Sequence, residues 1–196
     1  MIYLVIFIWL ILYLFLRGAR AWLIAYVVGA VGFTAIAVFY LRGTLIEARV
    51  EQLGALGAHY LSTAFGIPTR VFFDAPGTLL VLIVYQQSGW TAIEIDIECS
   101  GMLEFMVFSG LVLFYQGFPL LRRVLSLAIG IPIAYLINLC RIMIIVLMIS
   151  YGGKDSIYLA HTVVARAFFF AMAMALYWQV FTRPTLKLIN ERLTEE

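Results

Sequence analysis

The sequence predicts an all-α, polytopic membrane protein of about five transmembrane helices, with an outer-face amphipathic helix and a small β-meander. Three observations lead to this fold class. Apolar residues make up 64% of the 196 positions and charged residues only 12%, against about 45–50% and about 25% in soluble domains. Five long apolar stretches divide the chain, and basic residues gather at alternate connections between them. No water-soluble core of this size could hide so much apolar surface, so lipid must cover it.

The apolar stretches are residues 1–16, 21–41, 101–116, 124–150 and 160–181. A helix needs about 20 residues to cross the hydrocarbon core, so the first and third are at the short limit. The first stretch has no basic n-region and no small-residue cleavage site, which favours a retained helix over a signal peptide. Residues 1–196 are therefore expected to form a single integral membrane domain.

The basic residues predict the orientation. Three groups of them flank the stretches, which are Arg17 and Arg20, Arg122 and Arg123, and Arg183, Lys187 and Arg192. With five spans, all three groups fall on one side, which the positive-inside rule makes cytoplasmic. The other side would hold most of the acids together with Arg42, Arg49, Arg70 and Lys154. We therefore expect a multi-pass protein of the plasma membrane with its N-terminus outside. Residues 42–100 then form an extracytoplasmic segment.

The extracytoplasmic segment begins with an amphipathic pattern over residues 45–65. Its apolar positions at helical spacing are Val50, Leu53, Leu56, Tyr60 and Ala64. This pattern predicts a helix lying on the membrane surface. Residues 70–73, 78–85 and 91–98 then read as three strands, because Asp-Ala-Pro-Gly and Ser-Gly turn signals separate them.

The third predicted strand leads to a cysteine. One face carries Ile93, Ile95, Ile97 and Cys99, and the other carries Glu94, Asp96 and Glu98. This alternation is typical of a strand with one buried face. It would deliver Cys99 into Ser100-Gly101 and the start of the third span.

Polar side chains inside spans are costly and usually functional. Asn138 and Arg141 lie three residues apart on one face of the fourth span. Arg141 comes about five turns after the cytoplasmic entry, a rise of about 25 Å, which places it near the outer face. His161 opens the fifth span from the same side. Cys99, Arg141 and His161 are therefore expected at one membrane depth, in helices 101–181 that would carry the catalysis.

This grouping suits nucleophilic catalysis. A thiol attacks as thiolate, and its pKa falls at a helix N-terminus or beside a cation, both of which we expect for Cys99. His161 could take the thiol proton and return it to a leaving amine. Arg141 could hold the oxyanion, because its charge does not titrate away. Gly101 lacks a Cβ where a substrate backbone must come close.

Each residue also has a structural interpretation. Cys99, like Cys140, could be an inert packing residue, Arg141 could bond backbone carbonyls, and His161 could anchor the helix at the interface. Asn138 fits an interhelical hydrogen bond better than catalysis, and Arg166 could join the site or extend to the surface. Two histidines and two cysteines at these spacings do not form a metal site. No metal, cofactor or nucleic acid is expected.

The same motifs carry a family resemblance. Glu98-Cys99-Ser100-Gly101 at the start of one span, Asn138-x-x-Arg141 within the next and His161 at the start of another resemble the exosortase/archaeosortase family over residues 42–181. The length resembles the Gram-positive exosortase G branch or a compact archaeal form. The resemblance implies a cysteine transpeptidase or peptidase, with Cys99 as nucleophile, Arg141 as the family's arginine and His161 as the third member.

The resemblance also implies partners. Family members recognise a C-terminal sorting signal on an exported, membrane-anchored protein, which comprises a short motif, a transmembrane helix and a basic tail. They cleave it through a cysteine thioester and pass the new carboxyl end to an acceptor, here an unidentified lipid or glycan amine. Water in place of the amine would make the reaction intramembrane proteolysis.

Two other classes of function compete with the enzyme. One is a non-catalytic membrane assembly factor for exported polysaccharide or surface proteins, in which Cys99 is incidental. The other is a small transporter with Arg141 lining a substrate path. A transporter predicts paired broken helices near the midplane, and Pro132 in the fourth span has no matching break elsewhere. The transporter therefore ranks last.

Overall fold

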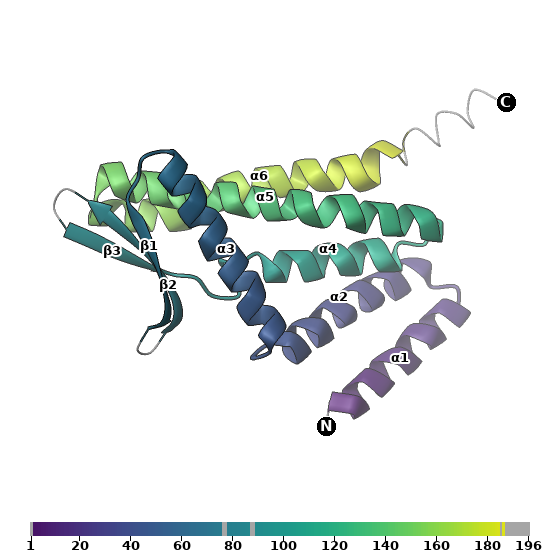
Figure 1. The fold of residues 1–196 in the computed structure, drawn as a ribbon. Helices are drawn as coiled ribbons and strands as arrows, with labels where there is room; N and C mark the ends of the chain where they lie inside the picture. The colour runs from purple at the N-terminus through teal and green to yellow at the C-terminus, as the bar shows by residue number, and fades with distance from the viewer. Residues whose placement is uncertain (1, 76–77, 87–88, 185, 187–196) are drawn as a thin grey trace.

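The computed structural model describes residues 2–75, 78–86, 89–184 and 186 (Figure 1). The helices are α1 (Ile2–Gly18), α2 (Trp22–Leu41), α3 (Leu45–Ala64), α4 (Met102–Phe114), α5 (Leu120–Gly152) and α6 (Ala165–Tyr177). The strands are β1 (Thr69–Ala75), β2 (Thr78–Gln86) and β3 (Gly89–Glu94). A 3₁₀ turn, Lys154–Ser156, and a π-helical segment, Leu159–Val164, lead into α6, and a second π-helical segment, Trp178–Thr182, follows it.

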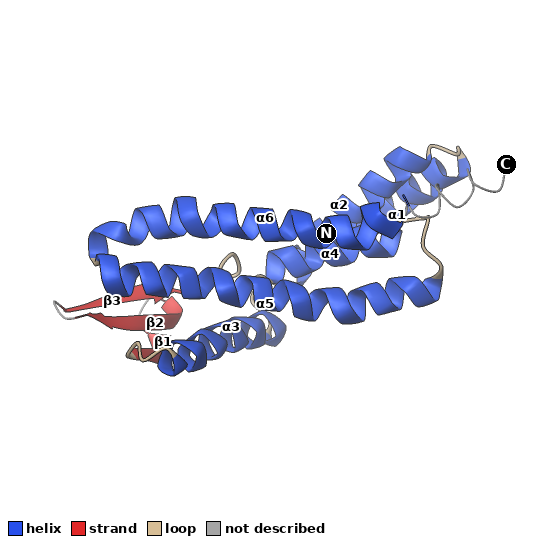
Figure 2. Cartoon of the chain, turned by 90° about the horizontal axis from the view of Figure 1, so that it is seen from above, coloured by secondary structure: helices blue, strands red, loops and turns tan. Residues whose placement is uncertain are grey.

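The helices α4, α5 and α6 run side by side, and α1 and α2 incline against α4 (Figure 1). The sheet and α3 lie together at one end of this bundle, which we call the sheet end. Seen from above, α5 runs between α6 on one side and the layer of α3 and the sheet on the other (Figure 2). The connections α1–α2 and α4–α5 lie at the opposite end.

The predicted membrane fold is confirmed. Three helices, Trp22–Leu41, Leu120–Gly152 and Lys154–Thr182, are long and apolar enough to cross a membrane, and two shorter apolar helices, Tyr3–Gly18 and Met102–Phe114, accompany them. These two shorter helices correspond to the predicted stretches 1–16 and 101–116, which are barely long enough to cross the hydrocarbon core. With 33 residues, α5 rises about 50 Å at 1.5 Å per residue. It therefore exceeds a hydrocarbon core of about 30 Å.

The sheet is an antiparallel meander of order β1-β2-β3. Alternate residues of β2, Leu80, Leu82 and Val84, are buried, because side chains in a strand alternate between its two faces. They belong to one apolar cluster with Ile142 to Ile149 of α5 and with Ala55 and Ala58 of α3. The sheet and α3 thus form a cap that packs on the last turns of α5.

The predicted apolar face of α3 is left exposed, as expected for a helix on the membrane surface, and a different face packs against the protein. The predicted apolar positions include Leu53 and Tyr60, which are 58% and 70% exposed. The buried positions are instead Glu51, Gly54, Ala55, Ala58 and Ser62. Small side chains let α3 approach α5 closely, whereas the large apolar ones point away from the protein. Amphipathicity in this helix identifies the face available to lipid, and the protein packs against the small residues.

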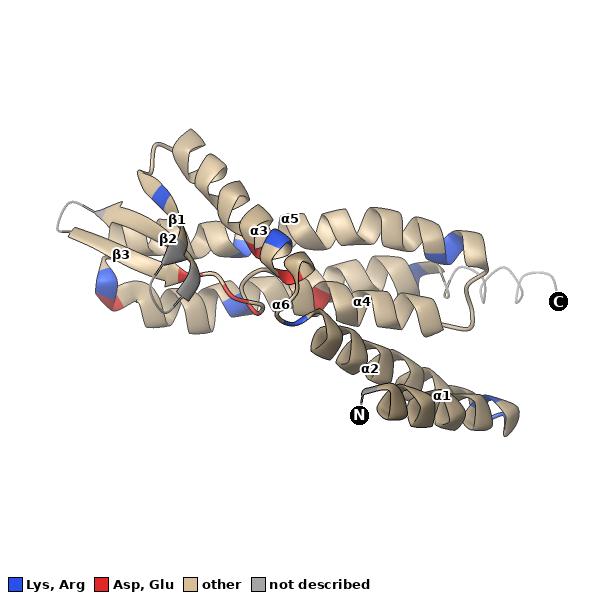
Figure 3. Ribbon diagram, turned by 60° about the horizontal axis from the view of Figure 1, so that its bottom comes forward, with Lys and Arg blue, Asp and Glu red and all other residues tan. Residues whose placement is uncertain are grey.

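Acidic residues gather at the sheet end, where basic residues also lie, and further basic residues lie at the opposite end (Figure 3). Arg122 and Arg123 begin α5 at the opposite end, and Arg17 and Arg20 lie near the α1–α2 connection there. The acidic side chains of α3, of the segment after β3 and of the first turn of α4 lie at the sheet end. Lys187 and Arg192, which the orientation prediction also used, lie outside the described residues.

Candidate active site

A tight turn after β3 presents Cys99. The strand ends at Glu94, so the predicted continuation to residue 98 is wrong. The Asp96 carboxylate turns back and accepts hydrogen bonds from the backbone N–H of Glu98 at 3.1 Å and of Cys99 at 2.9 Å. The Asp96 carbonyl accepts another from the Ser100 N–H at 2.8 Å. This side-chain turn replaces the sheet ladder, and it fixes the backbone of the cysteine.

Gly101 joins this turn to α4. Its φ of +81° is left-handed, a conformation that glycine adopts without a steric penalty. An added Cβ would lie 3.0 Å from the Asn138 side chain, so the space is also closed to other residues. In the structure the group close to Gly101 is the Asn138 side chain of α5, and the approach of a substrate backbone stays a prediction.

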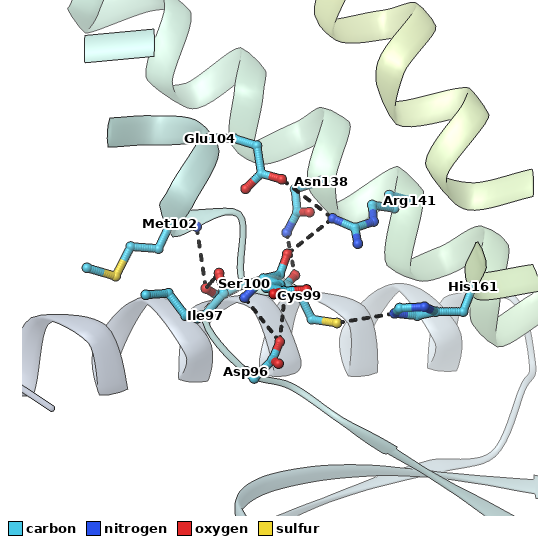
Figure 4. Close-up of polar contacts among 10 residues, drawn as sticks. Asp96, Ile97, Cys99, Ser100, Met102, Glu104, Asn138, Arg141 and His161 are labelled. Carbon is cyan, nitrogen blue, oxygen red and sulfur yellow. Dashed lines mark hydrogen bonds and ion pairs between the residues drawn. The ribbon is translucent and has the colours of Figure 1, made fainter. Parts of the chain in front are cut away.

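Asn138 and Arg141 hold the cysteine turn from α5 (Figure 4). Asn138 is fully buried and donates from Nδ2 to the Cys99 carbonyl at 2.8 Å. Arg141, 7% exposed, donates from Nη1 to the Glu98 carbonyl at 3.2 Å. Their spacing of three residues puts both on one helix face. Two consecutive carbonyls of the turn are thus anchored by one helix.

Two further groups surround the guanidinium of Arg141. Nη1 lies 3.7 Å from Glu104 Oε1, and the guanidinium carbon lies 5.4 Å from the centre of the Phe169 ring in α6. Glu104 Oε2 and Asn138 Oδ1 are buried, and neither has a hydrogen-bond partner among the described residues. Arg141 therefore links three helices around the turn that carries Cys99.

His161 reaches the cysteine from the other side of the site. Its Nε2 lies 3.6 Å from Cys99 Sγ, a distance suited to proton transfer with sulfur. The residue lies within the π-helical segment Leu159–Val164. π-Helical turns occur frequently at functional sites, because one extra residue per turn redirects a side chain. The structure thus brings Cys99, Arg141 and His161 into one cluster, with Asn138 beside them (Figure 4).

The electrostatics of the thiol differ from the prediction. Cys99 is 8% exposed. Burial, reinforced by the negative charge of Asp96, raises the pKa of the Cys99 thiol to about 11, and the opposing effect of Arg141 is smaller. The expected lowering of this pKa is therefore wrong. The thiol is protonated at rest near neutral pH, and attack requires a base to remove the proton.

The other predicted supporting residues have different positions. Ser100 is fully buried and acts inside the turn, where its Oγ donates to the Ile97 carbonyl at 3.1 Å. Arg166 is exposed and contributes positive charge near His161 rather than a hydrogen bond. Over the described residues, no group of three or more His, Cys, Asp or Glu side chains could hold a metal ion.

Sequence reasoning missed Asp96 and Glu104 as members of the cluster. Strand alternation placed Asp96 on the face opposite Cys99. Glu104 lies in the first turn of α4, where a carboxylate is explained by the helix dipole without any role in the site. The signal for Asp96 was its position three residues before the cysteine, which is the spacing of an Asp side-chain turn. Glu104 could be recognised only by knowing which helix faces α4.

Comparisons with known proteins identify the family of this chain. A family model described as transmembrane exosortase matches residues 1–179, a range that includes every residue of the cluster. No curated protein and no solved structure gives a match. Because the family model covers most of the chain, the protein belongs to the transmembrane exosortase family.

Proposed function

We propose that this protein is a membrane-embedded cysteine transpeptidase that cleaves a C-terminal sorting signal of exported proteins and transfers the product to an acceptor. The observation that carries the proposal is the 3.6 Å separation of Cys99 Sγ and His161 Nε2. These residues lie 62 positions apart in the chain. A nucleophile within reach of a base is the basic requirement of covalent catalysis.

In the acylation step, His161 Nε2 takes the proton from Cys99 Sγ as the sulfur attacks the scissile carbonyl carbon. The tetrahedral intermediate collapses when the C–N bond breaks, and His161 returns the proton to the leaving amine. A thioester on Cys99 and a free amine result. Proton transfer concerted with attack suits a thiol that is buried and protonated at rest.

Arg141 is the best candidate for stabilising the oxyanion. In many cysteine and serine enzymes the N–H of the nucleophile itself supplies an oxyanion donor, but the Cys99 N–H is bonded to Asp96. Arginine carries five N–H donors on a planar fork. The contact of Nη1 with the Glu98 carbonyl holds the guanidinium at the turn, so its charge lies beside the reacting carbonyl.

The family supports the proposed substrate and acceptor, and the charge distribution supports the proposed orientation. Membership in the exosortase family favours a membrane-anchored substrate with a C-terminal sorting helix, and a lipid or glycan amine as acceptor. The cluster lies toward the sheet end, away from the arginines of the α1–α2 and α4–α5 connections (Figure 3). By the positive-inside rule, the active site would face outside at the plasma membrane.

One observation favours a second candidate, a non-catalytic membrane assembly factor for exported polysaccharide or surface proteins. Cys99 is buried and its pKa is raised, as in a cysteine that serves only packing. The two candidates differ in whether the thiol is needed once the fold is intact.

Replacing the thiol separates them. A strain that lacks the gene is complemented with the wild-type protein, Cys99→Ala, Cys99→Ser or Cys140→Ala, and C-terminal processing of surface proteins is followed by mass spectrometry. Both Cys99 variants should insert normally yet lose more than about 10³-fold in processing rate, while Cys140→Ala should process normally. Full complementation by Cys99→Ala would exclude the transpeptidase and support the assembly factor.

A further inference from the structure

Two acidic residues lie near the turn that carries Cys99. Asp96 lies below the cysteine in Figure 4, and Arg141, Asn138 and Glu104 lie above it. Asp96 is exposed, so its second oxygen can be reached from solvent. The other carboxylate belongs to Glu51 of α3, which is only 7% exposed. The proposed acylation mechanism uses neither group.

The backbone places Glu51 against the cysteine turn. Glu51 lies one helical turn before Gly54, on the same face of α3. An added Cβ at Gly54 would lie 3.8 Å from Ser100 Cα, so α3 runs directly along the turn. Asp96 Oδ1 is 2.9 Å from the Cys99 N–H. Glu51 and Asp96 therefore approach the same turn from two elements.

Glu51 lacks a cationic partner. It makes no hydrogen bond or ion pair within the described parts of the chain. Burial, together with the charges of Glu47 and Asp96, raises the pKa of Glu51 to about 7. Burying a carboxylate without a partner costs free energy, and such groups occur mainly at sites where a ligand pairs with them. A bound cation would supply the missing charge.

We propose that Glu51 and Asp96 form the binding site for the primary ammonium group of the acceptor. The inference rests on the proposed transpeptidase function and adds the residues that bind the amine of the second substrate. The site adjoins Cys99, where a group that attacks the thioester must lie. A cation bound there would be attracted by two carboxylates.

These residues account for every proton and bond in the transfer of the acyl group to the amine. The ammonium first gives one proton to the carboxylate pair, which releases it to solvent. The resulting amine attacks the thioester carbonyl carbon, and the C–S bond breaks as the C–N bond forms. The nitrogen loses its second proton through His161 Nε2 to Cys99 Sγ. The products are an amide and the free thiol, and no oxidant or reductant is needed.

The test separates acylation from transfer. The full-length protein in lipid nanodiscs is acylated with p-nitrophenyl decanoate, and the acyl-enzyme is followed by intact mass spectrometry. Its decay is measured in water alone and with ethanolamine, glucosamine or phosphatidylethanolamine vesicles, with choline as an amine that cannot form an amide. Glu51→Gln and Glu51→Ala are compared with Glu94→Gln, which removes an exposed acid of β3.

In the wild-type protein and Glu94→Gln, primary amines should accelerate decay and yield the decanoyl amide, whereas choline should not. Greater acceleration by vesicles than by glucosamine would identify a lipid acceptor, and the reverse a glycan. Both Glu51 variants should acylate normally and decay normally in water, yet lose at least about tenfold of the amine-dependent rate. An unchanged amine-dependent rate in both variants would overturn the ammonium site and leave the transpeptidase standing. Absence of a Cys99 acyl-enzyme in the wild type would overturn the proposed function and, with it, this inference.

Discussion

The sheet end and the N-terminal helix pair α1–α2 use apolar residues in opposite ways. At the sheet end, Leu82, Ile142 and Ile149 are buried inside the protein. In α1, residues of the same kind, such as Leu10 and Phe15, are 44% and 69% exposed. The buried residues of α2 are only Ala25, Gly29 and Ala30, all small.

The difference follows from the solvent that each region meets. Lipid solvates apolar side chains, so α1 and α2 gain little by burying them in protein. The small residues of α2 instead allow close packing on α4, where Gly29 faces Phe114 and Gly110 faces the Ala30 carbonyl.

The sheet end carries backbone outside regular structure, such as the cysteine turn. That backbone is tolerated near a membrane only where protein covers it and bonds its polar groups. The same cover fixes the positions of Cys99, Asn138 and Arg141.

After the loss of the Cys99 thiol itself, the largest expected effect at the sheet end concerns Arg141. Arg141→Lys should lower the processing rate by at least about 10²-fold. A lysine ammonium is a point charge and cannot hold the Glu98 carbonyl and also present further donors in a fixed fork. Arg166→Lys is the matched control, because Arg166 is exposed on a neighbouring helix, and it should process within about twofold of wild type. Wild-type kinetics in Arg141→Lys would remove Arg141 from the mechanism.

The second prediction compares the two regions directly. Leu82→Ala in β2 should lower the free energy of unfolding by about 2–4 kcal/mol, because Leu82 is 0% exposed and truncation leaves a cavity. Leu10→Ala in α1 should cost less than about 1 kcal/mol, because lipid fills the space. Unfolding by SDS titration in bicelles measures both. Equal losses would show that α1 is packed as tightly as the sheet end.

The helices and the residues of the cluster could be predicted from the sequence. Long apolar stretches and polar residues within them are strong signals, because the cost of placing a charge in lipid is large. Arg141 and His161 were recognisable in this way, and the charge distribution put them at one depth with Cys99. The three strands were also recognisable, because Asp-Ala-Pro-Gly and Ser-Gly mark the turns between them.

The details that failed depend on contacts between distant segments. The alternation of Ile95 and Ile97 suggested a strand, but the Asp96 side chain offers the backbone a competing set of hydrogen bonds. The amphipathic pattern of α3 indicated the face toward the membrane surface, but it did not indicate which residues pack on α5, because helix packing near lipid favours small residues. The Cys99 pKa depends on burial by α3 and α5 and on Asp96, which no local pattern records.

The third prediction concerns the pH dependence of stability at the sheet end. The pKa of Glu51 is raised from 4.5 to about 7 in the folded protein, so folding favours the protonated carboxyl. This contribution is complete below about pH 4.5 and is lost as the pH rises toward 7. Glu51→Gln, which stays uncharged, should therefore be more stable than wild type by about 1–3 kcal/mol at pH 8 and equal to it at pH 4. An equal difference at both pH values would mean that the charge of Glu51 is not the cause.

The smallest effect is expected at Cys140. It is exposed, so it faces lipid although it lies between Leu139 and Arg141, both of which are buried. Cys140→Ala should change the free energy of unfolding by less than about 0.5 kcal/mol and leave processing intact. A larger loss in either would place Cys140 in the packed interior and contradict the division of α5 into a protein face and a lipid face.

The same variant isolates the thiol of Cys99 for measurement. With Cys140 removed, methyl methanethiosulfonate can modify only Cys99. Since the pKa of Cys99 is about 11, the thiolate fraction, and with it the modification rate, should rise about tenfold per pH unit from pH 7 to pH 9. A rate that reaches a plateau near pH 7 would mean that the thiol is already ionised at rest. The cysteine would then need no base for its first step, and the role of His161 would be confined to protonating the leaving amine.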